Sequence, residues 1–124
     1  AVTFAAHLEG LAYVERLCYQ VVADLGATVS EAIFVAGGGT GSEAGLQIRA
    51  DVLGRRLIVP EVPAGAMGAA ILAARAAGYD SVTSAARGMV RRARVVEPRR
   101  ELKSAYDQRY GRFVAACRHR GYLS

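Results

Sequence analysis

The sequence predicts an α/β fold built from short parallel strands and several helices. Two short apolar runs, residues 32–36 and 56–60, are bounded by polar and glycine residues and separated by a helical pattern, which is typical of buried parallel strands. A strand–helix–strand order predicts a right-handed crossover between the two strands. Because two strands do not make a stable α/β sheet, we expect further strands from sequence outside this chain or from a partner chain.

The first half of the chain contains two predicted helices with recognisable ends. Over residues 4–25, apolar side chains recur every three or four positions, as in an amphipathic helix, and Gly26 fits its end. A second helix is expected to begin at Thr40 and to end before Gly54. Thr40 and Glu43 have the spacing of a capping box, which predicts Thr40 as the N-cap and Glu43 as the third helical residue.

The second half of the chain is predicted to be mainly helical. Residues 64–77 form an expected helix rich in small side chains, and Ser81 is placed to cap another that continues to Val90. Residues 91–98 are polar and rich in arginine, so we expect a connector there. A last amphipathic helix is expected over residues 99–120.

Length and composition predict one small domain over residues 1–124. Hydrophobic residues make up 52% of the chain and charged residues 22%, a balance that supports a packed core and excludes disorder. No apolar run approaches the length of a membrane span. The two cysteines, Cys18 and Cys117, lack convincing metal-ligand spacing, which favours reduced thiols in a cytoplasmic protein without a bound metal. Because Ala1 lies within a helical pattern, we expect a fragment of a longer chain.

Three consecutive glycines, Gly37, Gly38 and Gly39, follow the first predicted strand and precede a helix. Glycine allows a ligand to approach the backbone closely, and a helix start offers free N–H groups and the positive end of the helix dipole. The loop suits a phosphate or a nucleoside edge, and we favour capping for Thr40 and ligand contact for Ser42. No GxxxxGK[ST] or GxGxxG motif is present. From the residues alone, a nucleotide loop and a tight turn without ligand both stay open.

The segment around these glycines resembles the C-terminal signature of the FGGY carbohydrate kinases. In that family a GGG-x-x-S segment leads into a helix ending AD-x-x-G and then into a short strand, and the likeness continues in order along nearly the whole chain. The matching stretches are Leu8–Ala12, Val35–Glu43, Ala50–Gly54, Leu57–Glu61, Gly65–Ala70, Met89–Val90 with Glu97–Pro98, and the aromatic residues Tyr106, Tyr110 and Phe113 of the last helix.

This resemblance implies the C-terminal half of an actin-like ATPase (ribonuclease H-like) domain from a xylulose kinase-like enzyme. The full-length enzyme would use ATP and Mg²⁺ to phosphorylate a hydroxyl of a sugar or polyol, with a xylulose-like pentulose favoured. The catalytic Asp and the metal-binding carboxylate would lie in an N-terminal domain outside this chain. No catalytic or metal-binding residue is therefore expected here, and the chain alone should be inactive. By resemblance it supplies the adenosine side of the site through Gly37, Gly38, Gly39, Thr40 and Ser42.

Two alternative functions stay open beside the kinase. Residues 87–124 carry eleven basic and three acidic residues, which could neutralise nucleic-acid phosphates. Aromatic residues are not interleaved with the basic run, as single-strand binders would require, so nucleic acid is not the expected partner. A non-enzymatic interaction module of the same fold is the other alternative.

Two further expectations concern single features of the fold. The strand edge at residues 33–35 is apolar, and if left unpaired it predicts self-association. Asp51 lies near a predicted helix C-terminus, where its charge is unfavourable for the helix dipole. We therefore expect it to make a specific structural hydrogen bond rather than to act in catalysis.

Overall fold

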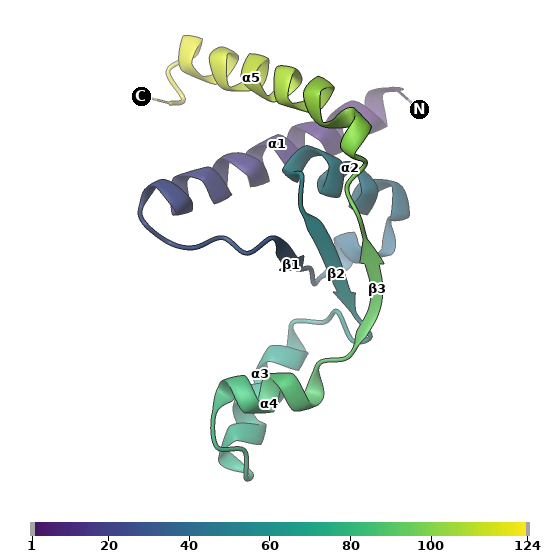
Figure 1. The fold of residues 1–124 in the computed structure, drawn as a ribbon, viewed down its shortest axis with the longest axis vertical. Coiled ribbons are helices and arrows are strands. Elements are labelled where there is room, and N and C mark those ends of the chain that lie inside the picture. The colour runs from purple at the N-terminus through teal and green to yellow at the C-terminus, as the bar shows by residue number, and fades with distance from the viewer. Residues whose placement is uncertain (1, 124) are drawn as a thin grey trace.

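The computed structural model describes residues 2–123, which form five α-helices, two 3₁₀ helices and one three-stranded sheet (Figure 1). In chain order the elements are α1 (Val2–Asp24), β1 (Ala32–Phe34), η1 (Gly38–Gly41), α2 (Glu43–Leu53), β2 (Arg56–Pro60), α3 (Ala66–Ala76), α4 (Val82–Met89), β3 (Arg92–Val96), η2 (Arg100–Leu102) and α5 (Lys103–His119). The mixed α/β class predicted from the sequence is confirmed.

The sheet has the order β1–β2–β3, with β2 in the centre. β1 pairs with β2 in parallel, with Ile33 opposite Leu57, as the strand–helix–strand pattern predicts. The backbone N–H of Val35 still donates to the carbonyl of Ile58 at 2.9 Å. The strand itself ends at Phe34, two residues earlier than predicted, because the chain turns there into the glycine loop.

The prediction of a connector over residues 91–98 was wrong, because Arg92–Val96 form β3, which pairs antiparallel with β2. Val96 lies opposite Leu57, and a register irregularity occurs near Pro60. The arginines of this segment favour a solvent-exposed connector when the sequence is considered alone. An edge strand accepts such side chains, since one of its flanks faces solvent, and in β3 half-buried Arg94 and Val96 alternate with exposed neighbours.

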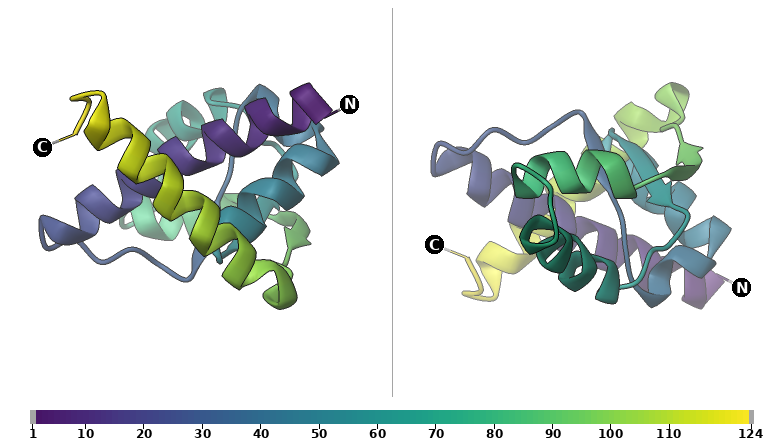
Figure 2. Two further views of the ribbon diagram at one scale, coloured as in Figure 1. Left: turned by 90° about the horizontal axis from the view of Figure 1, so that it is seen from above. Right: turned by 90° about the horizontal axis from the view of Figure 1, so that it is seen from below.

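The helices lie at two ends of the sheet. α1, α2 and α5 pack together at one end, and α3 and α4 form a pair beyond the other end (Figure 1). Viewed from above, α5 crosses over α1 (Figure 2). The glycine loop lies between β1 and α2 and is one of the connections that join the sheet to the group of α1, α2 and α5.

The core consists of two apolar clusters, one on each side of α2. The first joins α1, α2 and α5 through Ala12, Tyr13, Val52, Tyr106 and Tyr110. The second joins α2 to the strands through Val35, Leu46, Ala50, Leu57 and Val59. α2 therefore contributes side chains to both clusters, which fixes its position relative to the sheet. Within residues 2–123, no helix is long and apolar enough to cross a membrane.

One edge of the sheet and one face of α1 expose large apolar side chains. Phe34 on β1 is 54% exposed, and Phe4 and Leu11 on α1 are 65% and 69% exposed. In the part of the chain described here, β1 pairs only with β2. Its outer edge is therefore open to pairing with a further strand.

Candidate functional site

The glycine loop places three small residues at the carboxyl end of β1. Gly37 has φ 93° and ψ −178°. A residue with a side chain would be strained at this positive φ, whereas glycine adopts it readily. The Gly37 N–H donates to the carbonyl of Pro63 at 2.6 Å, which joins this loop to the connection between β2 and α3. A Cβ at Gly38 or Gly39 would meet no described atom within 4 Å. The loop therefore presents an open backbone surface at these two residues.

The capping role that the sequence assigns to Thr40 belongs instead to Ser42. Ser42, not Thr40, is the N-cap of α2, and its Oγ accepts a hydrogen bond from the N–H of Gly45 at 3.1 Å. Thr40 is buried, and its Oγ1 donates to the carbonyl of Gly37 at 2.7 Å. The predicted capping box of Thr40 and Glu43 is wrong because residues 38–41 form a 3₁₀ turn, which delays the start of α2. The Ser42 hydroxyl hydrogen remains available as a donor.

Arg94 on β3 fixes the outer side of the loop. Its Nη2 donates to the Thr40 carbonyl at 2.9 Å, and its Nη1 pairs with Glu43 Oε1 at 3.1 Å. Arg94 Nε is buried and lacks a hydrogen-bond partner among the described residues. The sequence singles out Arg94 only as one of many basic residues. Its contact with the loop depends on the pairing of β3 with β2, which the sequence analysis missed.

An apolar groove of about 770 Å³ opens next to the glycine loop. It is lined by the ends of β1 and β2, the start of α3 and the end of α4, with Ala36, Val62, Met67 and Met89 among its apolar side chains. Four charged residues, Glu61, Arg87, Arg91 and Arg92, also line this groove. A mainly apolar lining with a few polar groups, at this volume, is typical of small-molecule sites.

Asp51 makes structural hydrogen bonds, as predicted. Its side chain is fully buried and accepts hydrogen bonds from Gln47 Nε2 at 3.0 Å, from the Arg99 backbone N–H at 2.7 Å and from Arg99 Nε and Nη2 at 3.0 and 2.6 Å. The hydrogen bond to Asp51 raises the pKa of Arg99. These contacts hold the start of η2 against the end of α2.

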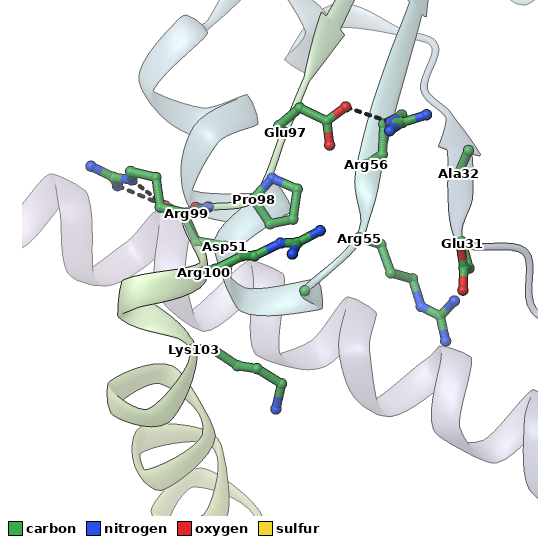
Figure 3. Close-up of a pocket in the computed structure, with 11 residues that line it drawn as sticks. Glu31, Ala32, Asp51, Arg55, Arg56, Glu97, Pro98, Arg99, Arg100 and Lys103 are labelled. Carbon is green, nitrogen blue, oxygen red and sulfur yellow. Dashed lines mark hydrogen bonds and ion pairs between the residues drawn. The ribbon is translucent and has the colours of Figure 1, made fainter.

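A second, charged pocket lies at the opposite end of α2 from the glycine loop. It has a volume of about 360 Å³ and is bounded by the start of β1, the junction of α2 with β2, and the junction of β3 with η2 (Figure 3). Within residues 2–123, no group of three or more acidic, histidine or cysteine side chains could hold a metal ion. The described residues therefore offer backbone, apolar and basic groups to a ligand rather than a metal centre.

Comparison with known proteins gives consistent matches. The model of the FGGY family of carbohydrate kinases, C-terminal domain, matches residues 1–77. An FGGY carbohydrate kinase domain-containing protein of Homo sapiens is 30% identical over 121 residues, which cover 96% of this chain and 22% of that protein.

Two solved structures have the same fold over most of the chain. A xylulose kinase from Rhodospirillum rubrum aligns with a TM-score of 0.74 and 29% identity, covering 90% of this chain and 23% of that one. A xyloylose kinase from Brucella ovis aligns with a TM-score of 0.79 and 31% identity, covering 94% and 24%. The chain thus spans less than a quarter of the length of each of these relatives.

Proposed function

Because this chain belongs to the FGGY family of carbohydrate kinases, we propose that it forms the adenosine side of the nucleotide site in an ATP-dependent sugar kinase. The observation that carries this proposal is the glycine loop. Gly38 and Gly39 have negative φ, and a Cβ on either would meet open space. Neither packing nor backbone strain within the described residues requires glycine there, whereas a nucleotide lying directly on the backbone would.

The surroundings of the loop suit a nucleoside. The groove beside it provides an apolar surface for a base, and its volume of about 770 Å³ falls within the usual range for small-molecule sites. The Ser42 hydroxyl can donate to an acceptor on the nucleotide while its oxygen caps α2. In the proposed site Gly37, Gly38, Gly39, Thr40 and Ser42 act together: the glycines admit the nucleotide, Thr40 braces the turn, and Ser42 faces the ligand.

The proposed reaction is phosphoryl transfer from ATP to a sugar or polyol hydroxyl. A bond forms between the acceptor oxygen and the γ-phosphorus, the bond from that phosphorus to the β–γ bridging oxygen breaks, and ADP leaves. The acceptor proton passes to a carboxylate that we assign, together with the Mg²⁺ ligands, to a further N-terminal domain. Such reactions depend mainly on positioning and charge stabilisation, and the glycine loop contributes positioning.

We favour a pentulose such as xylulose as the acceptor, because two solved relatives are described as xylulose and xyloylose kinases. Four of the eleven basic residues in the last third, Arg94, Arg99, Lys103 and Arg109, form ion pairs within the chain, which reduces the charge available to a nucleic acid. The same relatives favour an enzyme over a pure interaction module.

The test is ATP-dependent phosphorylation of a panel of pentuloses, hexoses and polyols by the intact protein. We expect turnover with at least one pentulose, and none from residues 1–124 alone. An intact protein that binds ADP but phosphorylates no member of the panel would overturn the kinase assignment while leaving the nucleotide site in place.

A further inference from the structure

The charged pocket at the far end of α2 differs in character from the apolar groove beside the glycine loop. It combines side chains from three separate segments of the chain (Figure 3). Its cationic lining consists of Arg55, Arg56, Arg99, Arg100 and Lys103, and its carboxylates are Glu31, Asp51 and Glu97. The positive charges outnumber the negative ones before any pairing is considered.

Two of the three carboxylates are already paired. Asp51 binds Arg99, with Oδ2 and Nη2 separated by 2.6 Å, and Glu97 Oε1 lies 2.5 Å from Arg56 Nε. The opposite charges within each of these two ion pairs cancel in the wall of the pocket. The cations that remain are Arg55, Arg100 and Lys103, and Glu31 is the remaining carboxylate.

Each of the remaining cations keeps hydrogen-bond donors free for a ligand. Arg55 Nη1 donates to the carbonyls of Val29 and Ser30, at 3.2 and 2.7 Å, which are neutral acceptors. Lys103 pairs with Asp107 at 2.6 Å, but that carboxylate also binds Arg16. The Arg100 side chain forms no hydrogen bond or ion pair with residues 2–123, and it extends into the space beside Arg55 and Pro98 (Figure 3).

From this arrangement we infer that the pocket binds a phosphate group, held by Arg55, Arg100 and Lys103. Like charges that line one cavity repel each other unless an anion lies between them. Guanidinium groups match the geometry of phosphate oxygens with two parallel hydrogen bonds, and an ammonium adds a point charge. Glu31 and Glu97 line the same cavity and disfavour a long polyanion. The fitting ligand is therefore inorganic phosphate or a small phosphate monoester.

This site is separate from the proposed nucleotide site. Ser42 caps α2 beside the glycine loop, whereas Gly54 ends the same helix at the pocket. An eleven-residue helix is about 16 Å long, so a phosphate group in this pocket does not overlap a nucleotide at the loop. The inference stands on the pocket alone and does not depend on the proposed kinase activity.

The experiment is titration calorimetry of the intact protein with inorganic phosphate and with ribose 5-phosphate, each in the presence of saturating ADP. We expect saturable binding that weakens as ionic strength rises. Tighter binding of ribose 5-phosphate identifies a phosphorylated metabolite as the ligand, and equal binding identifies free phosphate.

The variant Arg100→Ala removes an exposed side chain without an internal partner, so it should fold normally. We expect it to weaken phosphate binding about tenfold or more, because hydrogen bonds to charged groups contribute strongly. The matched control is Arg112→Ala, an exposed arginine on α5 away from the pocket, which should bind as the parent does. The inference is overturned if neither ligand binds saturably, if both variants bind equally, or if only a short RNA oligonucleotide binds.

Discussion

Replacing Asp51 by alanine tests whether this buried carboxylate holds the fold together. Asp51 is fully buried and accepts hydrogen bonds from Gln47 and from both the backbone and the guanidinium of Arg99. Alanine leaves the Arg99 N–H and the Gln47 amide without this acceptor, at about 1–3 kcal/mol for the buried groups. The Arg99 guanidinium is 49% exposed and can turn to water. The full cost of breaking a buried pair, about 3–5 kcal/mol, is therefore not reached.

We expect Asp51→Ala to lower the free energy of unfolding by about 2–3 kcal/mol. The unfolding midpoint in urea should fall by this loss divided by the m-value measured for the intact protein. The assay is urea unfolding of the intact protein, followed by far-UV circular dichroism. The matched comparison is Arg56→Ala, which breaks the Arg56–Glu97 pair, whose side chains are 53% and 59% exposed, and should cost no more than about 1 kcal/mol.

Two results would refute this reasoning. If Asp51→Ala shifts the midpoint no more than Arg56→Ala does, then burial and the Arg99 contacts do not stabilise the fold as argued. If Asp51→Asn, which keeps the shape of the side chain, leaves stability unchanged but abolishes turnover, then Asp51 acts in catalysis rather than in structure.

Three further predictions concern the glycine loop, the Asp107 carboxylate between α1 and α5, and the outer edge of β1. Arg94→Ala should weaken ADP binding several-fold, because Arg94 holds the Thr40 carbonyl; Arg75→Ala on α3, away from the loop, is the control, and equal affinities would count against the bracing role. The hydrogen bond from Lys103, aided by Arg16, lowers the pKa of Asp107, so its stabilising effect is present above about pH 4 and is lost as pH falls through the lowered pKa. The free energy of unfolding of Asp107→Asn should therefore fall less between about pH 5 and pH 2 than that of the control variant Glu101→Gln. Parallel pH profiles of unfolding free energy for the two variants would contradict this prediction. The outer edge of β1 and the side chain of Phe34 are exposed, so residues 1–124 should self-associate in analytical sedimentation. The variant Phe34→Lys should self-associate less than the parent chain. A parent chain that stays monomeric at all concentrations would contradict this prediction.

The sequence predicts the helices and the two parallel strands well, because their signals are local. Leu57, Ile58 and Val59 form a short apolar run that can only be a buried segment, and Gly54 ends α2 in the left-handed conformation that its residue type suggests. The structural role of Asp51 could be inferred from its place near a helix end, but its partner Arg99 could not, since the two lie 48 residues apart.

The missed features depend on contacts between distant segments. β3 is stabilised by pairing with β2 rather than by its own composition. From the sequence alone, Arg92 and Arg94 therefore indicate a solvent-exposed connector. Both Thr40 and Ser42 can cap a helix, and the spacing to Glu43 favoured the wrong one, because sequence does not reveal the intervening 3₁₀ turn. The charged pocket could not be predicted, since Arg55 and Arg100 meet only after the whole domain has folded.

The most direct test of the proposed nucleotide site is the dissociation constant of ADP for the intact protein carrying Gly38→Val. The new Cβ meets no described atom within 4 Å, so the urea unfolding midpoint should be unchanged, while the side chain occupies the surface where the nucleotide is proposed to lie. We predict binding weakened by about tenfold or more in Gly38→Val, and parent affinity in the control Gly111→Ala on α5. Unchanged ADP affinity in a correctly folded Gly38→Val protein would contradict the assignment of the glycine loop to the nucleotide.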